Sequence, residues 1–116
     1  MTGAPALSLA IAVQGAQANL PDIVGALPAD SAGQIEVLIC HASDDPLPAF
    51  LPARPGLRTV PGRPGALIPE LWRDGFLAAR AGWVATLTAH CPPRPDWYGR
   101  ALSLVAAADP RAAAFG

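Results

Sequence analysis

The chain alternates between short apolar runs and segments in which apolar residues recur at helical spacing. The run Leu7–Val13 predicts a strand that is buried on both faces, as strands of parallel sheets are. Similar runs predict further strands at Ile35–Cys40, Leu57–Val60 and Trp83–Leu87. The fourteen proline and eleven glycine residues imply frequent breaks between short elements. Four short strands are therefore expected.

Three other segments predict helices. Apolar residues at positions 20, 23, 24 and 27 have helical spacing. The clearest helix is expected over Ile68–Ala79, where apolar or small residues recur every three or four positions and Pro69 and Glu70 suit the first turn. A last helix is expected from Trp97 to Ala108, before an Asp-Pro pair that ends it. The helices thus separate most of the strands.

This alternation predicts the fold class. It favours an α/β domain with an open, mostly parallel, Rossmann-like sheet and helices on both faces. The expected strand order is 3-2-1-4. Residues 1–116 form a single domain in this interpretation, because the length suits one domain and the sequence shows no internal repeat or low-complexity linker.

Composition and charge exclude several classes of protein. The net charge of −1 gives no electrostatic reason to expect a nucleic-acid partner. The run Leu7–Val13 is too short to span a bilayer, and it follows no basic segment of the kind that opens a secretory signal. Two cysteines are too few for a disulfide scaffold. These features favour a cytoplasmic protein without a transmembrane segment.

The candidate chemistry lies where the predicted strands end. Ligands of open parallel sheets bind beyond the carboxyl ends of the strands. Three polar segments occupy that edge here, at Val13–Gln17, His41–Asp45 and Thr88–Cys91. The sequence has no Walker lysine motif, no Gly-X-Gly-X-X-Gly after the first strand and no Gly-X-Ser-X-Gly elbow. Kinase, dehydrogenase and hydrolase functions are therefore disfavoured.

The succession of these segments carries a family resemblance. The first strand and its turn, residues 9–20, are followed by a second strand that ends in the acidic, serine-containing loop at 41–45. A Gly-containing loop at 64–65, an amphipathic helix and a small-residue-plus-glycine step at 79–82 lead into the fourth strand. That strand ends in Thr88-Ala89-His90, ahead of the proline-rich stretch 92–97. In order and spacing the chain resembles the nucleotide-sugar-binding half of family 2 glycosyltransferases of the GT-A fold.

The resemblance implies a nucleoside-diphospho-sugar as ligand, with Mg²⁺ or Mn²⁺ accompanying it, and sugar transfer of the hexosyltransferase type to an acceptor hydroxyl. It places Thr88-Ala89-His90 where the family has its acidic metal-binding motif, so the motif is degenerate. Residues 1–116 are expected to lack the acceptor-side half, and no transfer is expected from them alone. The residues that the resemblance assigns to the site are Val13, Gln14, Gly15, His41, Ser43, Asp44, Asp45, Arg63, Arg73, Thr88, Ala89 and His90, with His90 as the candidate metal ligand.

Several alternatives stay open at this point. The chain is either the donor domain of a glycosyltransferase or a non-catalytic relative that binds a nucleotide or a protein partner. It could form a homo-oligomer or belong to a larger parent chain. Asp44 and Asp45 hold a ribose or base, or they form a solvated turn. The pairs at 40–41 and 90–91 contain the Cys and His ligands that zinc prefers, but the expected strand order puts these pairs about 10 Å apart.

Overall fold

A four-stranded parallel sheet forms the centre of the fold. The strands are β1 (Leu7–Val13), β2 (Ile35–Ala42), β3 (Leu57–Gly62) and β4 (Val84–Thr88), in the order β3-β2-β1-β4. A computed structural model of the chain describes residues 5–15, 20–27, 34–45, 47, 56–89 and 97–107. The parallel α/β class and the strand order predicted from the sequence are both confirmed.

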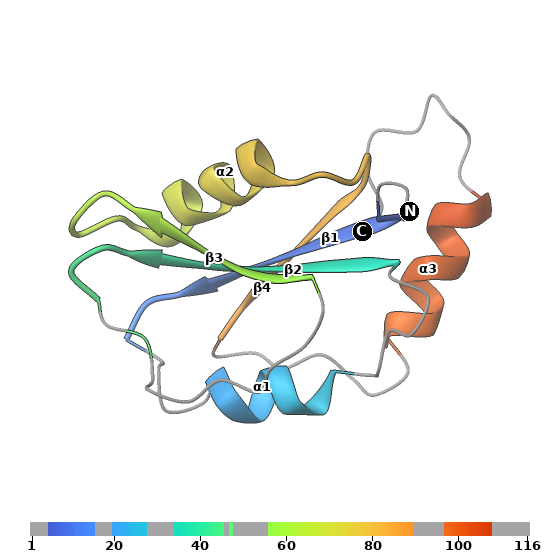
Figure 1. Cartoon of the computed structure of the whole chain (residues 1–116), viewed down its shortest axis with the longest axis horizontal. Helices are drawn as coiled ribbons and strands as arrows, with labels where there is room; N and C mark the ends of the chain where they lie inside the picture. Colours follow the sequence, from blue (N-terminus) through green and yellow to red (C-terminus); the bar gives the residue numbers. More distant parts are fainter. Residues whose placement is uncertain are drawn as a thin grey trace.

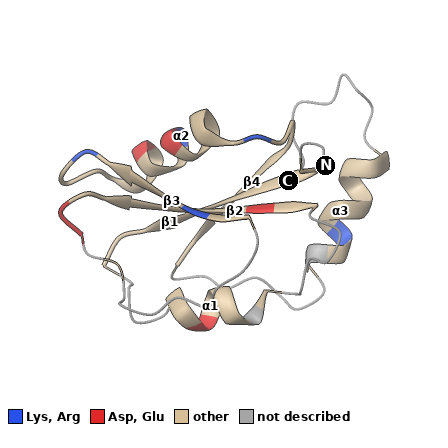
Figure 2. Cartoon of the chain, viewed as in Figure 1, with Lys and Arg blue, Asp and Glu red and all other residues tan. Residues whose placement is uncertain are grey.

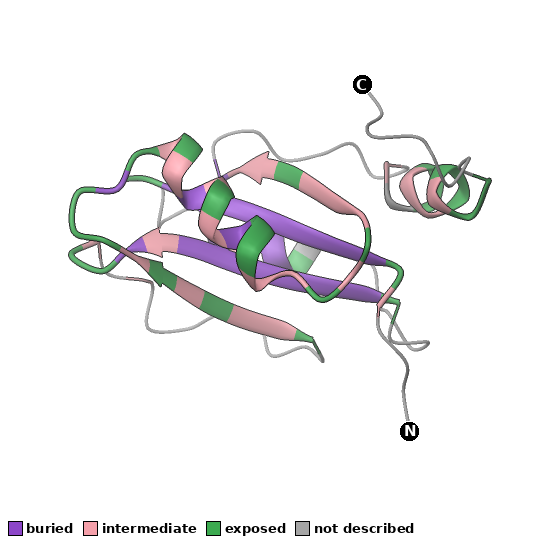
Figure 3. Cartoon of the chain, turned by 90° about the horizontal axis from the view of Figure 1, so that it is seen from above, coloured by how far each residue is buried: buried purple, intermediate pink, exposed green. Residues whose placement is uncertain are grey.

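Helices cover both faces of this sheet, as Figure 1 shows. Helix α1 (Leu20–Ala26) lies on one face and α2 (Ile68–Ala78) on the other, while α3 (Trp97–Ala107) lies near the amino ends of the strands. No helix in the described ranges has the length and apolar content needed to cross a bilayer. The two central strands are buried, whereas β3 and β4 are partly exposed (Figure 3).

The face of the sheet under α1 holds the larger of the two cores. Strands β1 and β2 direct alternate residues, such as Leu9, Ile11 and Ile39, toward α1. The helix contributes the apolar residues that the sequence pattern selected, and Trp97 and Leu102 of α3 pack against the same cluster. Core members from α1 and the turn after it are Leu20, Ile23, Val24 and Leu27. Helical periodicity therefore identified the residues that bury this face.

The opposite face carries small residues, and α2 lies close to it. Ala10 and Ala12 of β1 point toward α2 and pack in one cluster with Leu71. A Cβ atom added to Gly75 would lie 2.8 Å from the Ala10 Cβ and 3.0 Å from the Cys40 Sγ. The missing side chain of Gly75 thus sets the distance between helix and sheet. On the side toward β4, the Trp72 Nε1 donates to the Leu87 carbonyl oxygen at 3.0 Å.

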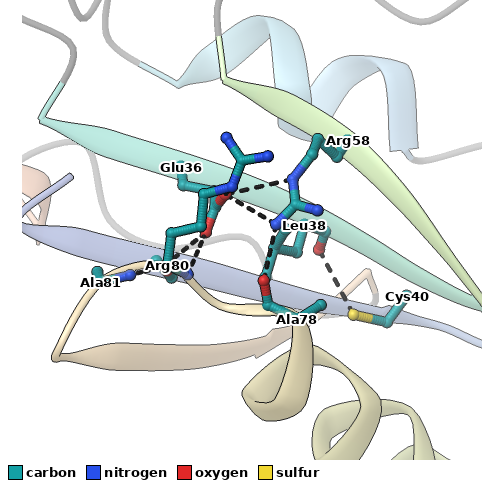
Figure 4. Close-up of polar contacts among 8 residues, drawn as sticks. Glu36, Leu38, Cys40, Arg58, Ala78, Arg80 and Ala81 are labelled. Atoms are coloured by element: carbon teal, nitrogen blue, oxygen red, sulfur yellow. Dashed lines mark hydrogen bonds and ion pairs between the residues drawn. The ribbon is translucent and has the colours of Figure 1, made fainter. Parts of the chain in front are cut away.

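A buried carboxylate fastens the amino edge of the sheet (Figure 4). Glu36 is only 4% exposed, and its Oε1 accepts from the Ser8 hydroxyl and from the Arg80 amide, both at 2.9 Å. Its Oε2 accepts from the Arg58 Nη2, also at 2.9 Å. Arg58 further donates to the Ala78 carbonyl oxygen at the end of α2, at 2.7 Å. One side chain therefore links three strands to the connection between α2 and β4.

Two strands run further than their apolar residues predict. Strand β2 includes His41 and Ala42, because both pair with β3 and the Ser43 amide donates to the Gly62 carbonyl oxygen at 3.1 Å. Strand β3 includes Pro61, which its edge position tolerates since a proline nitrogen has no hydrogen to donate. Strand β4 begins and ends one residue later than expected. The predicted helix bounds agree with α2 and α3 to within one residue.

The first prediction concerns the close approach at Gly75. Gly75→Ala should lower the free energy of unfolding by about 1–3 kcal/mol, because the new methyl group overlaps Ala10 and Cys40. Gly99→Ala in α3 is the matched control, since nothing lies within 4 Å of its added Cβ. It should be neutral or stabilising by up to about 1 kcal/mol. Urea denaturation of both variants measures the difference; equal effects would contradict the packing described.

The second prediction concerns Glu36 and pH. Burial on its own raises the pKa of Glu36, but hydrogen bonds from the Arg80 amide, Ser8 and Arg58 outweigh it and hold the pKa below its ordinary value of 4.5. The stabilising contribution is therefore complete above about pH 4.5 and is lost as the pH falls through the lower folded-state pKa.

Glu36→Gln should lower the free energy of unfolding at neutral pH by about 2 kcal/mol, because it weakens charge-assisted hydrogen bonds. It should also flatten the decline in stability on acidification. Denaturation curves at a series of pH values test both effects. A glutamine variant that loses stability with acid as steeply as the wild type would show that Glu36 is not the group responsible.

Candidate functional site

Three polar loops meet at the carboxyl edge of the sheet. They follow β1 at Gln14–Gly15, β2 at Ser43–Asp45 and β3 at Arg63–Leu67. In the strand order β3-β2-β1-β4, the chain fills one side of β1 before it returns to the other, so β1 marks the switch point. Open α/β sheets bind their ligands at such a point. Figure 2 shows that charged residues are sparse on the strands, which makes the charges of these loops distinctive.

The two aspartates after β2 connect the neighbouring loops. The Asp45 Oδ2 accepts a hydrogen bond from the Gly15 amide at 3.1 Å. The Asp44 Oδ1 accepts one from the Gly65 amide at 2.8 Å. Both glycines have positive φ, +67° and +72°, and a Cβ at either would have no atom within 4 Å. Adjacent aspartates therefore hold two exposed glycine turns on either side of the β2 loop.

His41 precedes this turn and helps to shape it. It is half-buried at the end of β2, beside Val13 of β1. Its Nδ1 lies 3.0 Å from the Ala42 carbonyl oxygen and 3.2 Å from the Asp45 carbonyl oxygen. The Asp45 amide in turn donates to the Ala42 carbonyl oxygen at 3.0 Å. The imidazole therefore closes the turn that positions both aspartates.

The end of β4 joins the same edge. Thr88 pairs with Ala12, and the Ala89 amide donates to the Ala12 carbonyl oxygen at 3.0 Å. Ala89 is buried and Thr88 is half-buried, so the threonine is the accessible member of this pair. His90, the candidate metal ligand, lies outside the described residues. The sequence-selected residues Val13, Gln14, Gly15, His41, Ser43, Asp44, Asp45, Thr88 and Ala89 thus lie on one edge.

The two arginines proposed from the sequence already have acidic partners. Arg63 is exposed in the loop after β3, and its guanidinium donates to Glu70 through Nε and Nη2, the latter at 2.6 Å. These hydrogen bonds and the negative charge of Glu70 raise the pKa of Arg63 above its ordinary value. Arg73 is 67% exposed on α2 and lies 3.6 Å from Asp74. A phosphate group would have to compete with Glu70 for Arg63.

The side chains that most often bind metals are scattered over the described residues. Across the described stretches, no three His, Cys, Asp or Glu side chains are grouped so that they could hold a metal ion. The Cys40 thiol is buried on the α2 side and donates to the Leu38 carbonyl oxygen at 3.7 Å. Burial, with a smaller contribution from the Asp74 charge, raises the pKa of Cys40 to about 12. Cys40 therefore stays a neutral thiol, which is a poor zinc ligand.

Sequence reasoning missed the arrangement around Glu36. A glutamate inside the apolar run at 35–40 was the available signal, because a charge within a buried strand needs a partner. Reasoning from the sequence also gave no role to the His41 Nδ1, since its partners are carbonyl oxygens that only the folded turn supplies.

The third prediction tests the aspartate contacts. Asp45→Ala should speed hydrogen exchange of the Gly15 amide several-fold and leave Gly65 unchanged, whereas Asp44→Ala should do the reverse. Both contacts are exposed, so each is expected to contribute only about 0.5–1 kcal/mol. Amide exchange followed by NMR gives the rates, and each variant serves as control for the other. If either variant speeds the exchange of both glycine amides by the same factor relative to wild type, the two contacts are not independent.

Comparison with known proteins gives one informative match. No family model matches the sequence. The chain is similar to the phosphoenolpyruvate guanylyltransferase of Salinispora arenicola (strain CNS-205), with 39% identity over 99 residues. The match covers 84% of this chain and 41% of that protein, so the chain spans about two fifths of the length of its relative. The similarity is therefore to an enzyme that transfers a nucleotidyl group, and membership of the family 2 glycosyltransferases is not confirmed.

Proposed function

We propose that this chain is the nucleotide-binding part of a nucleotidyltransferase and that its carboxyl edge takes a guanosine nucleotide. The observation that carries the proposal is the 39% identity to a guanylyltransferase, in a chain whose polar loops gather at the switch point of a parallel sheet. In such a transfer an acceptor oxygen attacks the α-phosphorus of the nucleoside triphosphate. The bond to the β-phosphate breaks, and pyrophosphate leaves.

The chemistry of the loops suits a guanosine nucleotide. Guanine presents two adjacent N–H donors, and a carboxylate offers two acceptor oxygens to such a pair. Asp44 is exposed, and for its Oδ2 no described residue supplies a hydrogen bond. The exposed backbone near Gly15 and Gly65 gives the phosphates room to approach, because neither glycine has an atom within 4 Å of an added Cβ. We therefore assign the base to the β2 loop and the phosphates to the glycine turns.

Magnesium fits this site only together with the nucleotide. Mg²⁺ commonly uses one or two carboxylates and completes its shell with substrate phosphates and waters. With Asp44 assigned to the base, Asp45 is the carboxylate beside the Gly15 turn, whose amide it accepts. When bound, the ion would neutralise charge on the phosphates. We infer weak binding of Mg²⁺ or Mn²⁺ by the protein alone and stronger binding in the presence of nucleotide.

A nucleoside-diphospho-sugar is the second candidate ligand. The succession of strand-end loops resembles the donor half of a glycosyltransferase, and a sugar nucleotide shares its nucleoside and two phosphates with the triphosphate. In this alternative the segment Thr88-Ala89-His90, which begins at the last residue of β4, stands at the place of the family's metal motif. The two functions differ in which bond of the donor breaks and in the preferred ligand, so a comparison of ligands separates them.

The fourth prediction is a ligand preference. GTP with Mg²⁺ should shift the amide resonances of Gly15, Asp44 and Thr88 more strongly than ATP, UTP or UDP-glucose at equal concentration. NMR titration of the 116-residue chain measures this, and amides of the Glu36 network at the opposite edge serve as internal controls. A stronger response to UDP-glucose would favour the sugar-transfer alternative. No response at the carboxyl edge to any of the four at millimolar concentration would refute a nucleotide site.

A further inference from the structure

The hydrogen bonds of His41 fix which of its nitrogens carries the proton. The Nδ1 lies within hydrogen-bond distance of two atoms, the carbonyl oxygens of Ala42 and Asp45. Carbonyl oxygens only accept, so Nδ1 must be the donor. In a neutral imidazole with a proton on Nδ1, the Nε2 carries the lone pair and acts as an acceptor. The turn after β2 therefore presets the tautomer.

The second ring nitrogen of His41, Nε2, is the one that a ligand at the candidate site would contact. No described residue makes a hydrogen bond to the Nε2 of His41, whereas the Nδ1 has two partners. The side chain is half-buried at the carboxyl edge, next to the end of β1 and ahead of Asp44 and Asp45. In the neutral ring this nitrogen can bond only a ligand group that donates a hydrogen. The phosphates of a nucleotide at neutral pH are acceptors, so they are not partners of the neutral ring.

The remaining donors of a nucleotide are its base N–H groups and its ribose hydroxyls. Guanine presents two N–H donors side by side, which suits the two oxygens of a carboxylate better than one ring nitrogen. A single hydroxyl matches the single lone pair of Nε2. We propose that the His41 Nε2 accepts a hydrogen bond from a ribose hydroxyl of the bound nucleotide. This assignment rests on the proposed function, because it needs a nucleotide at the carboxyl edge.

Two substitutions separate the roles of the two nitrogens. An asparagine amide reaches about as far as Nδ1, so His41→Asn keeps a donor for the turn and removes the acceptor at Nε2. A glutamine amide reaches about as far as Nε2, so His41→Gln restores an acceptor and loses the donor at Nδ1. A purely structural histidine would show the opposite pattern, with His41→Asn behaving as wild type in binding and only His41→Gln impaired.

The decisive experiment compares ribose analogues. Binding of GTP, 2′-deoxy-GTP and 3′-deoxy-GTP by wild type and both variants is measured by calorimetry with Mg²⁺ present. Wild type should prefer GTP over one of the two deoxy analogues by about two- to tenfold, the range expected for one hydrogen bond between neutral groups. His41→Asn should lose that preference because its GTP affinity falls to the deoxy level, and His41→Gln should restore part of it.

Other results would overturn the assignment in distinguishable ways. If His41→Asn keeps the full preference for the ribose hydroxyl, the Nε2 is not its partner, although the nucleotide site stands. If wild type binds none of the three nucleotides, the proposed function fails together with this assignment. Long-range ¹⁵N–¹H correlation spectra of the wild type determine the tautomer independently of binding, and a neutral ring with its proton on Nε2 in the free protein would contradict the geometry described.

Discussion

The Glu36 carboxylate is the interaction on which the rest of the structure most depends. It lies in the second strand, bonds the first strand through Ser8, and bonds the third through Arg58. It also fixes the amide of Arg80, where the chain leaves α2 for β4. A buried carboxylate that lost these donors would face an uncompensated desolvation cost. Glu36 therefore requires Ser8, Arg58 and the Arg80 amide to be in place together. Charge thus enforces an arrangement that apolar contacts alone would leave less specific.

The polar groups at the two ends of the strands are used differently. At the amino edge, side-chain charges are consumed by contacts within the protein, as the Glu36 network shows. At the carboxyl edge, each aspartate accepts a glycine amide, and His41 donates to the turn through one nitrogen. Among the described residues nothing bonds the Asp44 Oδ2 or the His41 Nε2, so these acceptors remain at this edge while its backbone is already ordered. A nucleotide would meet loops that are preorganised, which lowers the entropy lost on binding.

The sequence predicted the fold well because the fold depends on periodicity. Continuous apolar runs mark strands buried on both faces, and the spacing in α2 marks its buried side without reference to any partner. Strand bounds differed where backbone pairing decides the end, as at His41 and Pro61, because neither residue looks like a strand former from its side chain. The placement of loops at one edge followed from the parallel topology alone.

The site was less predictable, since its details depend on contacts between loops distant in sequence. Asp44 meets Gly65 across 21 positions and Asp45 meets Gly15 across 30, and no local pattern reveals such pairs. The segment Thr88-Ala89-His90 contains no carboxylate that would indicate a metal, so the resemblance predicted the topology of the site and not its chemistry. The preference for a guanosine nucleotide in the proposed function rests on the similarity to a guanylyltransferase and not on a sequence pattern.

The two outer strands of the sheet, β3 and β4, differ in whether a further strand can pair with them. Strand β3 carries Pro61, which cannot donate a backbone hydrogen bond, and the charged Arg58, so an added strand is discouraged there. Strand β4 has the sequence Val-Ala-Thr-Leu-Thr, without proline or charge, and within the described part of the chain it pairs only with β1. When the chain is isolated in solution, the exposed edge of β4 is the natural point at which a strand of another polypeptide can add. Self-association through this edge is therefore expected to increase with protein concentration.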